Sequence, residues 1–403
     1  MVFGIVLALL AGIFAGTFTG LFPGIHINLV AAFLLAGAGY FSGVDALVLA
    51  VFVVAMAVTH TFIDFIPSVF LGAPDEDSFL AVLPGHQLLK EGKGYEAVVL
   101  TLYGGMIALP IVLVFSFVFI YFLEDFFGFV QGFIPYVLIF ASFYLIFREE
   151  EFLISLSVFL FSGLLGLFAF NLPVEDPLLP LLSGLFGVSG LIVSLKDTPK
   201  LPKQEIANLR EIKMSRRGFL KSSFAAALVA PFSSFLPGMG SGQAAIVASE
   251  IMGEDANDKR NFLFLVGAIN TIVMALSFVT FYVIQKARTG AAVAVGEILG
   301  AFGFRELAVI FVVIFLSGIF SFFVGVFTAR ILALHISKVP YQIISLIVIF
   351  ILVNVNLVLS NPLGLIVLIT SSALGVFAIL SGARRINLMG VLLVPTIVFY
   401  LAG

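Results

Sequence analysis

Leu21-Phe22-Pro23-Gly24-Ile25-His26 and Phe235-Leu236-Pro237-Gly238-Met239-Gly240 are two Pro-Gly motifs in the middle of two long apolar stretches, residues 2–42 and 219–252. Proline removes a backbone donor and glycine tolerates unusual dihedral angles, so each pair can end one helix and let another begin. Broken backbone survives inside a bilayer only where protein buries it or where it lines a polar cavity. The motifs therefore predict two broken-helix hairpins and mark the expected functional site.

The composition places the chain in a membrane. Of 403 residues, 61% are hydrophobic and 11% are charged, and the mean hydropathy is +1.22, so a soluble core of this size could not hide the apolar surface. The 38 glycines and 16 prolines are typical of closely packed, locally broken transmembrane helices. The chain has no cysteine, its four histidines lack metal-ligand spacing, and no nucleic-acid footprint is visible. We expect a multi-pass protein of the cell membrane, without a cofactor or metal centre and not an enzyme.

Positive charges set the expected topology. Residues 196–221 form the longest polar segment, and their excess of lysine and arginine predicts a cytoplasmic position. Threading from this anchor places the basic loops inside and the acidic turns Glu124-Asp125 and Glu175-Asp176 outside. The inside loops are those at Lys90/Lys93, Arg148, Lys259-Arg260, Arg330 to Lys338 and Arg384-Arg385. A Ser215-Arg216-Arg217 run resembles a twin-arginine export signal, but its mid-chain position favours a chance match.

Apolar runs of about 20 residues predict ten spans between these loops. They are residues 45–71, 96–123, 131–148, 152–171, 178–195, 261–284, 305–330, 340–358, 362–383 and 386–402.

The threading works if each Pro-Gly stretch is a re-entrant hairpin, the first from outside and the second from inside. The predicted fold is therefore an all-α integral membrane protein with two halves, 1–195 and 219–403, joined by a basic linker, 196–218. Each half is one hairpin plus five spans, and because five is odd the second half is inverted relative to the first. His60-Thr61 and Asn270-Thr271 occur at similar offsets in the two halves. The alternative threading makes the hairpin arms full spans and gives fourteen crossings.

The helices that start after the Pro-Gly pairs would point free amide groups at the membrane midplane. Helix N-termini carry partial positive charge and bind carboxylate or phosphate oxygens, so a small anionic ligand is the working hypothesis. The alternative is that each Pro-Gly pair only kinks ordinary spans. The candidate binding residues are Pro23, Gly24, Ile25, His26, Asn28, His60, Pro237, Gly238, Met239, Gly240, Ser241, Gln243 and Asn270.

Other polar groups within apolar segments are candidates for gating or coupling. His60 and Asp64 have helical i, i+4 spacing, so they either serve function or satisfy each other. With Ser68 they are also the nearest constellation for an intramembrane enzyme acting on a lipid, which is the third reading. Asp64 or a histidine could carry coupling H+, whereas Na+ would use carbonyl groups. Lys90, Lys286 and Arg288 are candidate gates, with interfacial snorkelling as the alternative. Asn354 and Asn356 are expected to form interhelical hydrogen bonds.

Three motifs carry a resemblance to a known family. They are Gly16-Thr17-Phe18-Thr19-Gly20-Leu21-Phe22-Pro23-Gly24, then Gly72-Ala73-Pro74-Asp75-Glu76-Asp77 leading to Leu83-Pro84-Gly85 and Lys93-Gly94-Tyr95-Glu96-Ala97, then Leu236-Pro237-Gly238-Met239-Gly240. Together and in this order they resemble the large permease subunit of tripartite tricarboxylate transporters.

The resemblance implies uptake of di- or tricarboxylates driven by an ion gradient, by alternating access in which the two halves rock about the anion. It also implies a small membrane subunit and an extracytoplasmic binding protein as partners, and a homodimer is compatible with the sequence. The chain departs from the family in being short and in carrying Asp75-Glu76-Asp77 where small hydroxyl residues follow the loop proline. The hairpins also look similar to those of proteins that return polyprenyl-phosphate carriers across the bilayer. A lipid-carrier flippase is therefore the alternative function.

Overall fold

The computed structural model describes residues 2–22, 43–73, 77–147, 149, 151–196, 201–236, 240–286, 289–300, 303–338 and 340–402, and within these ranges it contains helices and no strand. The first half of the chain contains α1 (Val2–Leu21), α3 (Ala46–Ile63), α4 (Phe65–Leu71), η2 (Phe79–Ala81), α5 (Val82–Lys90), α6 (Gly94–Gln131), α7 (Ile134–Phe147), α8 (Phe152–Asn171), α9 (Leu178–Leu182), η3 (Ser183–Val188) and α10 (Ser189–Lys196). The second half contains α11 (Arg216–Ser233), α12 (Ser241–Met252), η4 (Gly253–Asn257), α13 (Lys259–Ile284), α14 (Gly290–Leu299), α15 (Phe304–Ile336), α16 (Tyr341–Leu359), α17 (Asn361–Leu380), η5 (Arg385–Met389) and α18 (Gly390–Ala402). The all-α prediction is confirmed.

Eight of the described helices are long and apolar enough to cross a bilayer. They are Val2–Leu21, Ala46–Leu71, Gly94–Phe129, Phe152–Asn171, Lys259–Ile284, Phe304–Ile336, Gln342–Leu359 and Asn361–Leu380. Seven coincide with predicted spans, whereas the predicted spans 131–148, 178–195 and 386–402 contain shorter helices. The eighth, α1, was predicted as a hairpin arm, but its 20 residues give it the length of a full span. In the second Pro-Gly stretch, residues 219–252, α12 has only 12 residues, which are too few to cross the bilayer alone. The two stretches thus differ, and their re-entrant arrangement stays a prediction.

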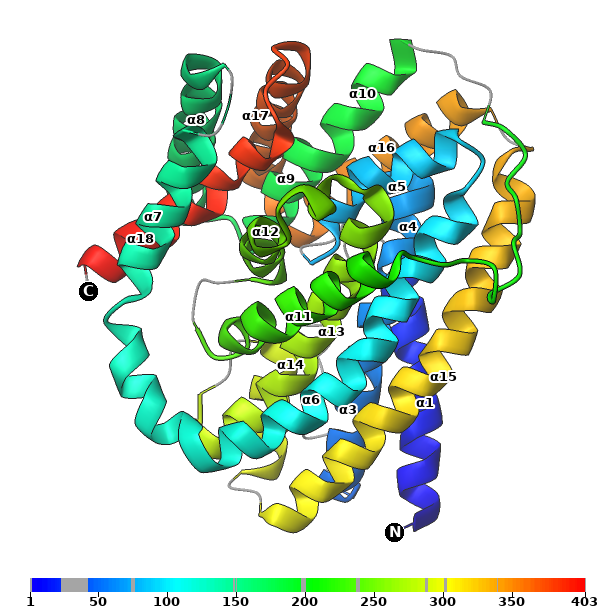
Figure 1. Cartoon of the computed structure of the whole chain (residues 1–403), viewed down its shortest axis with the longest axis vertical. Helices are drawn as coiled ribbons and strands as arrows, with labels where there is room; N and C mark the ends of the chain where they lie inside the picture. Colours follow the sequence, from blue (N-terminus) through cyan, green and yellow to red (C-terminus); the bar gives the residue numbers. More distant parts are fainter. Residues whose placement is uncertain are drawn as a thin grey trace.

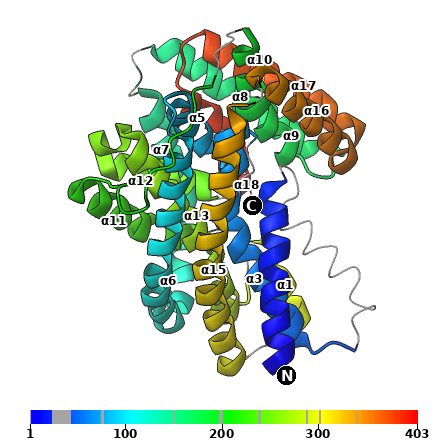
Figure 2. The same cartoon turned by 90° about the vertical axis from the view of Figure 1, so that its right-hand side faces the viewer.

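The helices form two groups that pack mainly within themselves. We call α1, α3–α6 and α11–α15 the central group, and α7–α10, η5 and α16–α18 the lateral group. Both views show α8, α10 and α17 at one end of the molecule, whereas α15 runs along most of its length and reaches the other end (Figures 1 and 2). Among the described helices, α16 against α4 is the main helix contact that joins the groups. Since domains joined by small interfaces tend to move relative to each other, the division favours movement between the groups.

Glycines allow the central helices to approach closely. α13 is almost completely buried and crosses α6 where Gly104 and Gly267 face backbone of the opposite helix. A Cβ atom on Gly267 would clash with the carbonyl oxygen of Thr101. Along α1, Gly12, Gly16 and Gly20 lie against α3 in the same way. These contacts follow the small-residue packing rule for helices in membranes.

The two halves of the chain present matching elements in the same order. The span Ala46–Leu71 and α13 both have 26 residues, α6 and α15 have 38 and 33, and α8 and α17 both have 20. The packing partners match as well. In the first half α1 packs on α3, and in the second half α11 packs on α13. Similarly, α8 of the first half packs on α18 of the second, and α17 of the second half packs on α9 and η3 of the first. Thr61 and Thr271, which occur at similar offsets in the two halves, meet at 3.2 Å between their Oγ1 atoms.

The loops predicted to share a side lie together. Lys259 forms an ion pair with Glu91 at 2.7 Å, and Arg384 forms one with Glu149 at 2.7 Å. The linker contacts the same region, because the backbone N–H of Glu205 donates a hydrogen bond to the Gly92 carbonyl. These loops were all threaded to the inside. Of the loops threaded to the outside, Ser360 Oγ donates to the Asp176 carbonyl at 2.9 Å, and Lys286 lies over the Phe127 ring.

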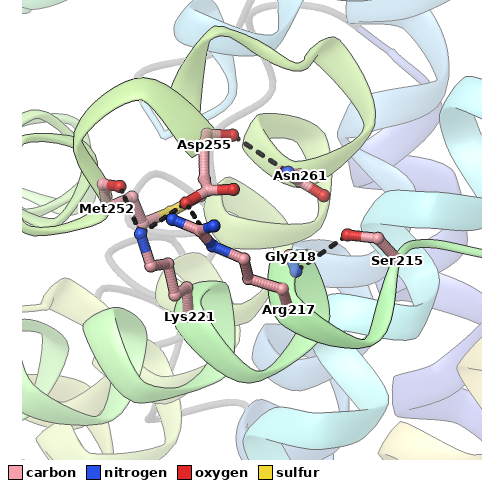
Figure 3. Close-up of polar contacts among 7 residues, drawn as sticks. All are labelled: Ser215, Arg217, Gly218, Lys221, Met252, Asp255 and Asn261. Carbon is pink, nitrogen blue, oxygen red and sulfur yellow. Dashed lines mark hydrogen bonds and ion pairs between the residues drawn. The ribbon is translucent and has the colours of Figure 1, made fainter.

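The Ser-Arg-Arg run belongs to the fold. Ser215 caps α11 by accepting a hydrogen bond from the Gly218 amide, and Arg217 Nε lies 3.3 Å from the Asp255 carboxylate (Figure 3). Lys221 also bonds Asp255. The run therefore starts a helix that ion pairs tie to η4.

Candidate functional site

The N-terminus of α12 begins directly after the second Pro-Gly motif. Gly240 is its N-cap and provides no side-chain cap. Ser241 donates a hydrogen bond from its Oγ to the Asp77 carboxylate, which comes from the loop between α4 and η2. A carboxylate at this position is favoured by the partial positive charge of a helix N-terminus.

A cavity of about 470 Å³ opens at this helix end, and we call it the α12 cavity. It lies between the central and lateral groups. Its described lining residues are Asp77, Phe170, Leu178, Gly240, Gly242, Gln243, Leu392, Pro395, Thr396 and Phe399. This volume falls within the range of about 300–1,000 Å³ typical of sites for small ligands.

Polar groups are few in the α12 cavity. Asp77 is the one charged side chain among its described lining residues. Gln243 is 5% exposed and lines the cavity. An amide side chain at this position can donate a hydrogen bond to a ligand.

A cluster of buried polar side chains joins α1, α3, α13 and α15. Thr19 Oγ1 lies 3.0 Å from His60 Nδ1, and Asn270 Nδ2 donates to Asp64 Oδ2 at 2.9 Å. Ser321 on α15 donates to Thr59 Oγ1 at 2.9 Å. His60 and Asp64 are thus each bonded to another helix, which ties four central helices together.

The third reading, an intramembrane enzyme, finds no support in the geometry of Ser68. Its hydroxyl donates to the Asp64 backbone carbonyl at 3.0 Å and lies 2.7 Å from Ser78 Oγ. A relay needs a hydroxyl bonded to the imidazole that would take its proton, whereas the Ser68 contacts run to other groups.

A second cavity, of about 380 Å³, lies between α5 in the central group and α10, α17 and η5 in the lateral group. We call it the basic pocket because Lys90, Arg384 and Arg385 line it. Arg385 donates from Nη2 to the Phe186 carbonyl at 2.7 Å and to Ser189 Oγ at 3.1 Å. Burial, followed by the charges of Lys90 and Arg385, lowers the pKa of His86 in this pocket to about 3.

Two tilted aromatic rings in contact lie between the cavities. Phe79 and Phe186 are both almost fully buried, with ring centroids 4.6 Å apart. On one side, the Arg385 guanidinium lies 5.8 Å from the Phe186 ring. On the other, a Cβ on Gly242 would lie 2.6 Å from Phe79 Cε1. The ring pair thus separates the basic pocket from the α12 cavity.

The structure brings some predicted residues together and disperses others. Gly240 and Gln243 line the α12 cavity, and Ser241 bonds Asp77 beside it. His60, Asp64 and Asn270 belong to the buried cluster instead. Lys90 lines the basic pocket, and the exposed Lys286 stacks on Phe127 at 4.8 Å. Outside the described residues lie Pro23, Gly24, Ile25, His26, Asn28, Pro237, Gly238, Met239 and Arg288.

Sequence reasoning missed several residues at the two cavities. In the sequence, Asp77 was noted only because it departs from a family motif, and Arg385 only because its positive charge placed a loop inside. The interhelical hydrogen bonds predicted for Asn354 and Asn356 were wrong. Each side chain instead donates to a carbonyl of its own helix, at Phe350 and Leu352. The acidic run around Asp77 was a usable signal, whereas burial of Arg385 has no local signature.

Comparisons with known proteins agree with this architecture. The model of the tripartite tricarboxylate transporter TctA family matches residues 6–390. An uncharacterized protein of Methanocaldococcus jannaschii is 33% identical over 366 residues, covering 87% of this chain and 88% of that protein. No solved structure matches. The chain therefore belongs to the TctA family of tripartite tricarboxylate transporters, a family of multi-pass membrane transporters rather than enzymes.

Proposed function

We propose that the chain is the permease of a secondary transporter for a small di- or tricarboxylate and that the α12 cavity holds the anion. The observation that carries the proposal is the position of Gln243, which lines a cavity of ligand size beside the N-terminus of α12. Helix amides and a neutral amide side chain can bind carboxylate oxygens without a fixed positive charge.

Asp77 places a negative charge in the wall of this cavity. A carboxylate ligand would lie near the Asp77 carboxylate, and like charges in a site of low polarity repel strongly. A proton or a Na+ ion that binds with the substrate would remove this repulsion. Asp77 is therefore our candidate for the coupling residue, in place of Asp64, which the Asn270 bond ties into the buried cluster.

The proposed alternating access differs from a rocking of one sequence half against the other. The two halves form an inverted repeat in our proposal, which the matched helix lengths and partners support. However, each helix group draws members from both halves, so the groups are the moving bodies. A small membrane subunit and an extracytoplasmic binding protein are the proposed partners, as in the tripartite family.

Exchange of labelled citrate or succinate across proteoliposomes at millimolar substrate tests the proposal. We expect Gln243→Leu to weaken substrate binding roughly ten- to a hundredfold, the loss of a hydrogen bond to a charged group. We expect Asp77→Asn to exchange substrate but to lose the acceleration that a pH or Na+ gradient gives the wild type.

The matched control is Gln342→Leu, which changes an exposed glutamine on α16 and should behave as the wild type. Equal behaviour of the Gln243 and Gln342 variants would contradict the proposed site. Retained gradient dependence in Asp77→Asn would remove the coupling role from Asp77 but leave the binding site intact.

A further inference from the structure

The basic pocket has the size and position of a second ligand site. Its volume of about 380 Å³ lies in the range of small-molecule sites. Glycines at 187, 190 and 382 leave part of its wall without side chains. Like the α12 cavity it lies between the central and lateral groups, but the Phe79–Phe186 ring pair separates the two.

Two of the three basic side chains that line this pocket, Lys90 and Arg385, have no ion pair with a described residue. Its described lining residues include no aspartate or glutamate. Arg384 is paired with Glu149, whereas Lys90 has no ion pair among the described residues. The Nε of Arg385 is buried and has no hydrogen-bond partner there, although Nη2 of the same side chain makes several bonds. A buried guanidinium donor without an acceptor is costly unless a ligand supplies one.

The same charges act on His86, which also lines the pocket. Lys90 and Arg385 both act to lower its pKa, in addition to burial, so the ring is neutral at physiological pH. Lys90 and Arg385 therefore supply the unbalanced positive charge, and an imidazolium does not add to it.

We propose that the basic pocket binds an anion bearing carboxylate or phosphate oxygens, with Lys90 and Arg385 as its ligands. Arginine and lysine are the usual partners of such oxygens, and Lys90 and Arg385 both line the pocket. This second site is distinct from the α12 cavity and does not depend on the substrate assigned to that cavity.

The absence of tryptophan from the chain allows a direct test. Leu83→Trp places one reporter in the basic pocket, where Leu83 is 47% exposed, and Phe399→Trp places one in the α12 cavity. Each purified single-tryptophan protein is titrated with citrate and with inorganic phosphate while its fluorescence is recorded. We expect a saturable change from the Leu83 reporter with at least one of these anions, and the anion that binds identifies the source of the oxygens.

Variants of the two basic residues then locate the charge that binds. Lys90→Gln should weaken the response about tenfold or more, and Lys338→Gln, which changes an exposed lysine elsewhere, should not. Arg385→Lys keeps the charge but loses the planar fork, so it should also weaken binding while remaining folded.

The proposal is overturned if the Leu83 reporter gives no saturable change with either anion, or if Lys90→Gln and Lys338→Gln respond alike. The Phe399 reporter keeps this failure separate from failure of the proposed function. A response there with silence at Leu83 removes only the second site, and the reverse pattern removes only the α12 site.

Discussion

The bond between Asn270 and Asp64 should be one of the strongest polar ties between the halves of the chain. We predict that Asn270→Leu destabilises the protein by about 1–3 kcal/mol. The substitution keeps the branching and the number of side-chain heavy atoms but removes the N–H group that donates to Asp64 Oδ2 at 2.9 Å. Both side chains are at most 2% exposed, so water cannot replace the lost donor.

The chain provides a matched control at Asn356. This asparagine is also fully buried, but its Nδ2 bonds a carbonyl of its own helix and its Oδ1 has no partner among the described residues. Asn356→Leu removes an unsatisfied buried oxygen and should therefore change stability by less than about 0.5 kcal/mol or increase it.

Unfolding by sodium dodecyl sulfate, followed by circular dichroism in mixed micelles, measures both free energies. A double-mutant cycle with Asp64→Leu then isolates the pair, since bonded partners show non-additive effects. Equal changes for the Asn270 and Asn356 variants, or an additive cycle, would refute the assigned role of the bond.

Three further predictions concern packing and titration. Gly267→Ala should destabilise the protein by about 1–3 kcal/mol because its Cβ meets the Thr101 carbonyl. Gly128→Ala, whose Cβ meets nothing within 4 Å, should stabilise the protein by up to about 1 kcal/mol. Thermal unfolding in detergent compares the two variants, and equal effects would contradict the close crossing of α6 and α13. Burial, followed by the charges of Lys90 and Arg385, lowers the pKa of His86, on the short helix α5, to about 3, so the protein loses stability as pH decreases from about 6.5 towards 3. His86→Phe should flatten this part of the pH profile, and an unchanged profile would show that the imidazole does not titrate there. The hydrogen bond from Lys221 lowers the pKa of Asp255, so Asp255→Asn should destabilise at neutral pH and low salt but not at high salt, where exposed ion pairs are screened.

Much of the fold could be predicted because the bilayer restricts a chain so strongly. Lengths of apolar runs gave seven of the eight long helices, and positive charges gave loop sides that match the observed contacts of Lys259 and Arg384. The division into central and lateral groups could not be predicted, because it depends on which helix faces pack together. Hydropathy records that a helix is apolar but not which apolar neighbour it contacts.

The site was predictable only where chemistry is local. The Pro-Gly motif indicated the start of α12, and Gly240 and Gln243 lie at the cavity that opens there. Asp77 and Arg385 reach the two cavities from distant loops, so their roles follow from tertiary contacts alone. His60 and Asp64 were grouped by i, i+4 spacing, but each bonds a partner on another helix, at Thr19 and Asn270.

Thermal stabilisation of the purified protein by a ligand panel tests the central claim most directly. The panel contains citrate, succinate, other small carboxylates and short-chain polyprenyl phosphates. A ligand at 100 times its dissociation constant adds about 2.7 kcal/mol to the folded state. We predict that a small carboxylate stabilises the wild type and that Gln243→Leu weakens this effect. Stabilisation only by the polyprenyl phosphates would contradict the carboxylate assignment and make the lipid-carrier flippase the leading account.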